Sequence, residues 1–372
     1  MGKLINHMNV IEVENLSTQD LANPINKAFL ESLEEYRLSW PITHPALEKD
    51  SPEFLEVSEE RVWKVLPNLN PSKSVGPDRI PNWLLREHAD LIAFPVCRIL
   101  DASFRRQRLP RSWKFVDVIP LPKKKPVEIL QKGLRPFSLT LCLSKVAEEF
   151  TVADYIKPAV LKDLDTNQYG AVPKSPTTLA LLDMVYDWSK GTDGNSATIR
   201  PVSCDYRKAF DLIDRGIPIR KLCILNVPNS IVNWIIDFLS NRSQRIKLGG
   251  GFVSDWESVP SGVPQGTKLG RCFFFIMIND LGVENPLLWI SVDDTSISET
   301  VAKGELSNAQ CTTDGVVLWS LENTAHLNTA KCKEMRISFT KSQQEFEPIL
   351  INGDALEVVD SLKLLDSVFP VI

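Results

Sequence analysis

Three aspartates stand where predicted strands end, and carboxylates in such positions can do chemistry. Asp205 closes an apolar segment, and Asp293 and Asp294 lie at the turn between two short apolar runs. Two desolvated carboxylates side by side are costly unless a cation neutralises them. Carboxylate oxygens bind Mg²⁺, and two such ions can clamp the attacking and leaving oxygens of a phosphoryl transfer. The alternative interpretation of Asp293 and Asp294 is ordinary turn chemistry.

The elements that must position these aspartates predict an α+β domain. Alternating apolar residues predict short strands, and apolar residues at helical spacing predict the helices between them. The strands are expected within 113–125, 198–206, 244–248, 252–259, 286–300 and 334–339, and the helices within 82–106, 144–155, 177–188, 231–240, 271–281 and 308–327. This order predicts antiparallel strands with helices on one face.

Charge is unevenly distributed along the 372 residues, although the formal net charge is only −5. Residues 1–60 hold four Lys/Arg against twelve Asp/Glu, whereas residues 61–135 hold sixteen against six. The first segment predicts a solvated acidic extension. The second also contains Trp and Phe residues and predicts a phosphate-binding surface, with a merely solvated basic face as the alternative.

Cysteine usage and hydropathy exclude several classes of protein. The seven cysteines form no CxxC pair and no Cys/His spacing that would bind zinc, which predicts reduced thiols in an intracellular protein of the nucleus or cytoplasm. The N-terminus lacks an apolar signal core, and the longest apolar run, residues 272–278, is too short to span a bilayer. We therefore predict no membrane partner and no small-molecule cofactor.

Eight motifs follow one another along the chain. They are KSVGPDRIPNWLL (73–85), WKFVDVIPLPKK (113–124), LRPFSLTLCLSKVAEEF (134–150), DYRKAFDLID (205–214), SGVPQGTKLG (261–270), INDL (278–281), VDDTSIS (292–298) and LNTAKCKEMRISF (327–339). In these motifs and their order, the chain from about residue 73 to 365 resembles the reverse transcriptases of non-LTR retrotransposons, which include LINE and jockey-like elements. Each motif alone is weak, but all eight in order are specific.

The resemblance implies a right-hand polymerase with fingers and a palm, the antiparallel palm sheet being backed by helices. It implies an acidic extension or linker over 1–60, fingers over 61–200 and a palm over 201–372 that ends near the primer grip. Elements of this kind also encode an endonuclease before the polymerase and a thumb after it. We expect neither in this chain, and therefore a fragment of an element with the thumb absent.

The resemblance also assigns the catalytic residues. It implies that Asp205 and Asp293 bind two Mg²⁺ ions, for which Mn²⁺ can substitute, and that Asp294 is the third catalytic carboxylate. The backbone carbonyl of Tyr206 is implied as a further metal ligand. Lys331, with Lys333 as the alternative, matches the general acid that protonates the pyrophosphate leaving group.

Other positions match the residues that bind the incoming dNTP. Phe210 would select against a ribose 2′-hydroxyl, and Gly266 would allow close backbone approach to the nucleotide. Core packing of the phenylalanine and a plain turn are the structural alternatives. The matching positions are Lys123, Lys124, Arg135, Phe210, Gln265 and Gly266.

The implied reaction is attack of a DNA primer 3′-hydroxyl on the α-phosphate of a dNTP opposite an RNA template. Ser291, Arg271 and the missing thumb favour an alternative, a catalytically inactive, degenerate nucleic-acid-binding module derived from such an enzyme, whereas the retained Asp205, Asp293 and Asp294 oppose it. Three residues depart from the family pattern. Ser291 replaces an aromatic residue, Arg207 replaces a small one, and Arg271 would place a charge where a helix enters the core. An unrelated metal-dependent hydrolase using the same carboxylates is a third hypothesis.

Overall fold

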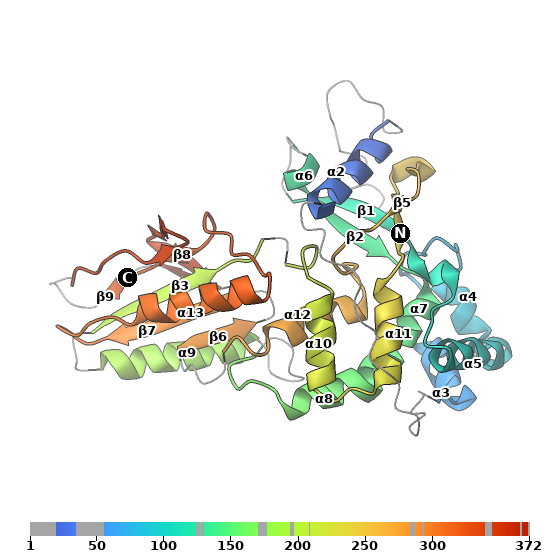
Figure 1. Cartoon of the computed structure of the whole chain (residues 1–372), viewed down its shortest axis with the longest axis horizontal. Coiled ribbons are helices and arrows are strands. Elements are labelled where there is room, and N and C mark those ends of the chain that lie inside the picture. The colour runs from blue at the N-terminus through green and yellow to red at the C-terminus, as the bar shows by residue number, and fades with distance from the viewer. Residues whose placement is uncertain are drawn as a thin grey trace. The chain divides into compact units, whose positions relative to one another are not determined.

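The predicted strands and helices occur in two units of the computed structural model (Figure 1). Unit 1 comprises residues 1–162 and 210–273, and unit 2 comprises residues 163–209 and 274–372. Each unit therefore uses two separate parts of the chain, and the fingers–palm division near residue 200 stays a prediction. The structure describes residues 20–34, 56–123, 127, 130–169, 177–193, 197–207, 209–282, 287–291, 294–338, 344–364 and 367–370.

Unit 1 contains a four-stranded sheet with the order β2-β1-β4-β5. Strand β1 (Phe115–Pro122) pairs antiparallel with β2 (Leu134–Leu139) and parallel with β4 (Ser243–Ile246). Strand β4 in turn pairs antiparallel with β5 (Glu257–Ser258). The parallel β1–β4 pair differs from the predicted antiparallel arrangement, because it joins segments far apart in the sequence that no local turn signals.

One face of this sheet is covered by α2 (Ala22–Glu34). Ile25 and Phe29 of the helix belong to a buried cluster with Val116 and Val118 of the sheet. Burial of such side chains stabilises the fold by about 1.5–3 kcal/mol each. Residues 22–34 are therefore core-forming and differ from the solvated extension predicted for this part of the chain.

The other helices of unit 1 follow the apolar patterns, with one break. The predicted helix over 82–106 is divided at His88 into α4 and α5. The helices are α3 (Glu59–Val65), α4 (Asn82–Glu87), α5 (Ala89–Arg105), α6 (Leu130–Gly133), α7 (Cys142–Thr151), α8 (Lys157–Lys162), α10 (Gly216–Ile224) and α11 (Asn229–Leu239), with short turns at Leu66–Asn68, Arg111–Lys114, Val152–Ile156 and Gly249–Gly251. Helix α12 (Lys268–Ile278) begins in unit 1 and ends in unit 2.

Unit 2 is built on a six-stranded sheet with the order β12-β8-β3-β7-β6, in which β9 also pairs with β3. All pairs are antiparallel except β12 with β8. The predicted strand over 334–339 is divided into β8 and β9. The strands of this unit are β3 (Thr198–Cys204), β6 (Leu288–Ser291), β7 (Asp294–Val301), β8 (Lys333–Glu334), β9 (Ile337–Ser338) and β12 (Glu357–Val358), and two hairpins add β10 (Leu350–Ile351), β11 (Asp354–Ala355), β13 (Ser361–Leu364) and β14 (Ser367–Pro370).

Helices cover both faces of the unit 2 sheet. Trp188 of α9 (Thr177–Thr192) donates from Nε1 to Ser298 Oγ at 2.6 Å. The next residue of β7, Glu299, accepts at 3.0 Å from the N–H of Ala309, where α13 (Ala309–Glu322) begins. Because successive strand residues point to opposite faces, α9 and α13 lie on opposite sides. The prediction of helices on one face is wrong for this sheet.

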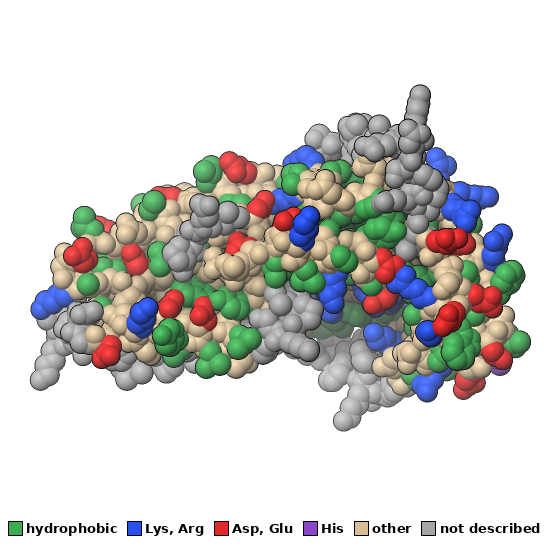
Figure 2. All heavy atoms as spheres, turned by 90° about the horizontal axis from the view of Figure 1, so that it is seen from below, with side chains coloured by type: hydrophobic (Ala, Val, Ile, Leu, Met, Phe, Trp, Pro, Cys, Tyr) green, Lys and Arg blue, Asp and Glu red, His purple; other side chains and the backbone are tan. Residues whose placement is uncertain are grey.

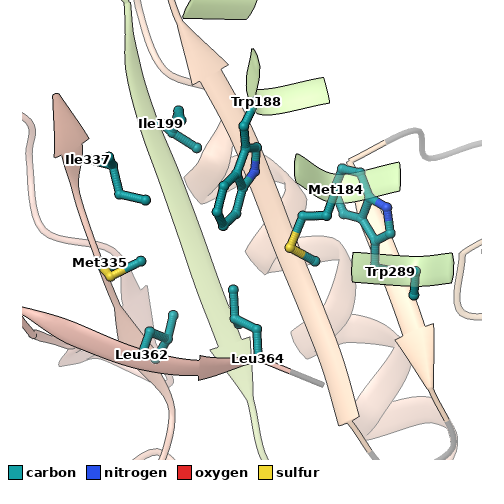
Figure 3. Close-up of a cluster of buried hydrophobic side chains, with 9 residues drawn as sticks. Met184, Trp188, Ile199, Trp289, Met335, Ile337, Leu362 and Leu364 are labelled. Carbon is teal, nitrogen blue, oxygen red and sulfur yellow. The ribbon is translucent and has the colours of Figure 1, made fainter. Parts of the chain in front are cut away.

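The α9 face of the sheet is apolar. Figure 3 shows Met184 and Trp188 of α9 directed toward Ile199 and Trp289 of the sheet. Leu362 of β13 closes the same cluster from a later part of the chain. This core fixes β3 and β6, the strands that lead to the predicted catalytic aspartates.

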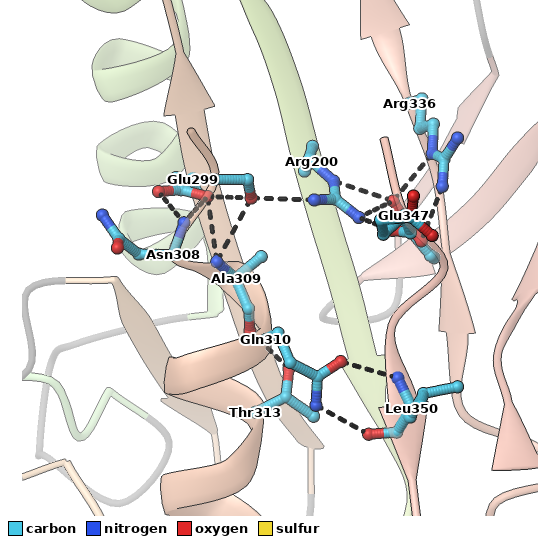
Figure 4. Close-up of polar contacts among 11 residues, drawn as sticks. Arg200, Glu299, Asn308, Ala309, Gln310, Thr313, Arg336, Glu347 and Leu350 are labelled. Carbon is cyan, nitrogen blue, oxygen red and sulfur yellow. Dashed lines mark hydrogen bonds and ion pairs between the residues drawn. The ribbon is translucent and has the colours of Figure 1, made fainter. Parts of the chain in front are cut away.

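The opposite face carries a buried polar network (Figure 4). Arg200 and Glu334 form an ion pair of 2.8 Å, and the side chains are 4% and 0% exposed. Arg200 also donates to Ser307 Oγ at 2.8 Å, and Ser307 donates to Glu299 at 2.6 Å. The network therefore joins β3, β7 and β8 to the start of α13.

Within the described residues, no helix is long and apolar enough to cross a membrane.

Candidate functional site

Asp205 follows the last residue of β3, and backbone contacts fix it there. Its N–H donates to Cys332 Sγ at 3.4 Å, and its carbonyl accepts from the Asn328 N–H at 2.8 Å. The carboxylate lies 3.2 Å from Lys331 Nζ. The Asp205 side chain is 37% exposed, so a ligand can reach a carboxylate whose backbone is fixed.

A short turn brings Lys331 to Asp205. Leu327 pairs with Tyr206, and the Lys331 N–H then donates to the Asn328 carbonyl at 2.8 Å, the spacing of a β-turn. Lys333, which follows on β8, instead forms an ion pair with Glu357.

Asp294 lies on the strand next to Asp205. Cys204 pairs with Thr295 in the antiparallel register, so Asp205 and Asp294 occupy the adjacent facing positions. Asp294 is exposed and begins β7, whereas Asp293 lies outside the described residues. Mg²⁺ binds carboxylate oxygens, so the side chains of Asp205 and Asp294 are of the chemical type that could hold this ion. Among the described residues, no group of three or more such side chains is placed to hold a metal ion.

Tyr206 turns its side chain into the core. Its hydroxyl lies 3.3 Å from Thr295 Oγ1, and its ring makes edge contacts with Phe274 and Trp319. Burial raises the pKa of Tyr206 well above its usual range, so the phenol stays neutral. The flanking residues Asp205 and Arg207 make the backbone hydrogen bonds to residues 326–328. In an antiparallel pair the residue between them points its carbonyl the other way, so the Tyr206 carbonyl faces away from that segment. The role of this carbonyl as a metal ligand stays a prediction.

Two buried thiols support Asp205 and were not found by sequence reasoning. Cys332 accepts the Asp205 N–H, and a hydrogen bond joins Cys204 to Cys332. This bond and burial raise the pKa of Cys204, while the same bond lowers the pKa of Cys332. Scattered single cysteines carry no sequence signal for such a role, because the two meet only through the β3–β8 register.

In unit 1, the predicted nucleotide loop lies against the turn that follows Asp205 in sequence. Gly262 has φ +71°, and a Cβ there would lie 2.2 Å from the Asp211 carbonyl oxygen, so only glycine fits. The Val263 N–H donates to the Phe210 carbonyl at 3.2 Å. Gln265 Nε2 donates to Asp211 Oδ1 at 2.7 Å. The loop and the turn are thus held together by three close contacts.

The same loop also lies against β2. The Ser138 N–H donates to the Gln265 carbonyl at 3.0 Å. Gly266 has φ +95°. A Cβ at this position would lie 3.2 Å from the Ser138 carbonyl oxygen and next to the Phe137 ring. Arg135 is exposed and lies two residues before Phe137, on the same face of the strand.

Lys123 lies at the end of the β1–β2 hairpin near Arg135. Leu121 pairs directly with Arg135, and the Lys123 N–H donates to the Gly133 carbonyl at 2.8 Å. Lys123 is exposed, and Lys124 lies outside the described residues. Unit 1 therefore holds the described members of the predicted nucleotide-binding set, namely Lys123, Arg135, Phe210, Gln265 and Gly266.

Arg215 is a positioning residue that the sequence did not reveal. It donates from Nε to the Gly262 carbonyl at 2.8 Å and from Nη2 to the Ser261 carbonyl at 2.9 Å. Arg215 is 5% exposed, and burial lowers the pKa of its guanidinium to about 10. Arg215 lies just outside the motif 205–214 and has no sequence signal for this role, because only the fold places it beneath the loop.

Replacing Arg215 by Met should destabilise unit 1 by about 2 kcal/mol, because two buried carbonyls lose their hydrogen bonds. The measurement is urea unfolding, compared with wild type. Arg220→Met is the matched control, since Arg220 is exposed on the following helix α10. Equal midpoints for the two variants would contradict the positioning role.

The helix after the loop is held by a buried carboxylate. Glu148 of α7 accepts from the N–H groups of Lys268 and Leu269 at 2.9 and 3.3 Å, where α12 begins. Burial raises the pKa of Glu148. Further along α12, Arg271 is exposed, so the prediction that its charge enters the core is wrong.

Figure 2 shows Lys and Arg side chains more often over unit 1, the right-hand part of this view, than over unit 2. The described part of the basic block 61–135 belongs entirely to unit 1. The predicted phosphate-binding surface therefore belongs to the same unit as the candidate nucleotide loop.

Comparison with known proteins gives three informative relatives, although no protein-family profile matches the chain. It is 22% identical over 327 residues to the RNA-directed DNA polymerase from mobile element jockey of Drosophila melanogaster, covering 83% of this chain and 34% of that protein. It is 25% identical over 238 residues to a probable RNA-directed DNA polymerase from transposon BS of the same species, covering 61% and 25%. It is 24% identical over 176 residues to the retrovirus-related Pol polyprotein from type-1 retrotransposable element R2 of Popillia japonica, covering 47% and 24%.

Two of these relatives are named as RNA-directed DNA polymerases, which are nucleotidyltransferases, and the chain is similar to them. More particularly, it is related to the RNA-directed DNA polymerases of non-LTR retrotransposons. The chain spans about a third of the length of the jockey protein that it matches.

Proposed function

We propose that this chain contains the polymerase core that adds dNTPs to a DNA primer on an RNA template. The observation that carries the proposal is the arrangement at the end of β3, where Asp205 contacts Lys331 and faces Asp294 on the next strand. We assign the fingers role to residues 61–200 and the palm role to residues 201–372. The similarity to two RNA-directed DNA polymerases and one Pol polyprotein of mobile elements supports the polymerase proposal.

Asp205 and Asp293 would hold two Mg²⁺ ions, with Asp294 and the Tyr206 carbonyl beside them. When bound, these ions would activate the primer hydroxyl and neutralise charge on the phosphates. Lys331, whose ammonium group lies beside Asp205, is placed to protonate the departing pyrophosphate.

The remaining residues would bind the dNTP. Arg135 offers a planar fork for phosphate, and the lysines after β1 add positive charge. Gln265 and Gly266 would pack on the nucleotide, because Gly266 has no side chain to prevent close approach. Phe210 would exclude a ribose 2′-hydroxyl.

The test is dNTP incorporation on an RNA template with a DNA primer and either Mg²⁺ or Mn²⁺. We expect incorporation that Asp293→Ala abolishes. Incorporation unaffected by Asp293→Ala would contradict the assignment, and cleavage of the nucleic acid in place of extension would indicate a hydrolase.

Lys331→Gln should lower the incorporation rate at least about tenfold. This effect is smaller than that of a typical general acid, because water can reach this exposed position and supply the proton instead. Lys333→Gln is the matched control, since Lys333 lies two residues further along the chain and pairs with Glu357. A rate measurement at saturating dNTP separates the two. Equal rates for both variants would exclude the role of Lys331.

An inactive nucleic-acid-binding module is the second candidate, and Ser291 favours it. This serine is buried at the end of β6 and pairs with Asp294, where the family has an aromatic residue. If the wild type binds primer–template but does not extend it, and Ser291→Tyr restores extension, the chain is a relic with an intact metal site. If neither extends, the binding module is the remaining function.

A further inference from the structure

A basic cavity lies on unit 1 apart from the candidate nucleotide loop. It has a volume of about 850 Å³ and is bounded by the end of α5, the turn Arg111–Lys114, the end of α11 and the start of β4. Among the described residues, its charged lining consists of Arg106, Arg108, Arg111, Lys114 and Asp237. This excess of cations over carboxylate makes it a site for anions.

The end of α5 is built to display two of these arginines. The Gln107 N–H donates to the Phe104 carbonyl, and the Arg108 N–H donates to the Ser103 carbonyl, both at 3.0 Å. These two bonds form a Schellman motif with Gln107 at φ +53°. The motif satisfies the last carbonyls of the helix, so Arg106 and Arg108 are not required to cap them.

The carboxylate in the lining is already engaged. Asp237 accepts from the Leu109 N–H at 2.7 Å and from Lys114 Nζ at 2.8 Å. Within the part of the chain that the structure describes, Arg106, Arg108 and Arg111 make no side-chain hydrogen bond or ion pair. The cavity therefore presents three uncompensated guanidinium groups, whose planar forks match phosphate oxygens.

An aromatic residue in the lining favours a nucleic-acid strand over a free phosphate. Phe115 lines the cavity and makes an edge contact with Trp256, which is 38% exposed. Cationic grooves with accessible aromatic rings bind single strands through backbone phosphates and base stacking.

We propose that this cavity binds the phosphodiester backbone of a single-stranded nucleic acid. The site rests on the proposed function, because it gives the template or its displaced strand a second contact outside the nucleotide loop. The exposed, neutral side chain of Asn241 in the same lining can meet sugar hydroxyls.

The test is fluorescence anisotropy with labelled single-stranded RNA and DNA of the same sequence, without dNTP, over a range of salt concentrations. The double variant Arg106→Ala/Arg108→Ala should bind about tenfold more weakly and lower the salt slope by about 1.4, since each phosphate contact on a single strand contributes about 0.7. The matched control is Arg86→Ala/Arg98→Ala, which removes the same charge from exposed positions on α4 and α5. The control should keep the wild-type slope.

Each outcome bears on the cavity. Equal losses on RNA and DNA would support backbone phosphate as the ligand, and a loss confined to RNA would support a site that also reads ribose hydroxyls. Binding by the double variant equal to that of the control would overturn the proposal, as would absence of binding by the wild type. Incorporation by the wild type, measured on the same preparation, reports on the proposed function separately.

Discussion

A chain carrying Asp205→Asn is expected to incorporate dNTP at least about a thousandfold more slowly than the wild type, the equivalent of about 4 kcal/mol in the barrier. The amide has the shape of the carboxylate but lacks the charge that a divalent cation needs. Folding should be preserved, because the substitution removes only a partly exposed ion pair with Lys331, which contributes at most about 1 kcal/mol. The measurement is single-turnover incorporation on an RNA template.

Glu357→Gln is the matched control for Asp205→Asn. Glu357 is an exposed carboxylate of unit 2 that pairs with Lys333, just as Asp205 pairs with Lys331. It should leave incorporation unchanged. If both variants lose activity equally, the effect is general charge removal and Asp205 is no metal ligand.

Gly262→Ala should lower the free energy of unfolding by about 3 kcal/mol and raise the KM for dNTP. The left-handed backbone at this position costs a residue with a Cβ about 1–2 kcal/mol, and the new atom would overlap the Asp211 carbonyl oxygen. The loop must then move away from the turn, which breaks the bond between Gln265 and Asp211. Urea unfolding and steady-state incorporation measure the two effects.

Gly251→Ala is the matched control, because it separates the cost of the left-handed backbone from the cost of steric overlap. Gly251 has a similar φ of +86°, but a Cβ there meets no atom within 4 Å. It should cost about 1 kcal/mol from the backbone alone and leave KM unchanged. Equal destabilisation by the two alanines would show that the close approach at Gly262 is not needed.

Local patterns in the sequence predicted most elements of the fold. Alternation or a short apolar run located β1, β3, β6 and β7, and helical spacing located α9, α11 and α12, because the apolar side chains of these elements are largely buried. The order of motifs indicated a resemblance to the polymerases of non-LTR retrotransposons, and the relatives confirm this resemblance. Patterns of this kind are short-range and report which residues are buried within one element.

Long-range arrangement could not be predicted in the same way. The parallel β1–β4 pair and the helices on both sides of the unit 2 sheet depend on contacts between distant segments. No motif or spacing in the sequence singled out Arg215 or the cysteines beside Asp205. The proximity of Asp205 and Lys331 was expected only through the family resemblance, since 126 positions separate them in the chain.

The position of β3 in its sheet has a consequence for synthesis of the protein. This strand is central, yet its partners β7, β8 and β9 all follow it in the chain, and the segment 210–273 between them belongs to the other unit. During synthesis on the ribosome, both edges of β3 therefore stay unpaired until more than a quarter of the chain has been synthesised after it. We therefore expect slow folding with a high contact order and aggregation of nascent chains that stop before β7.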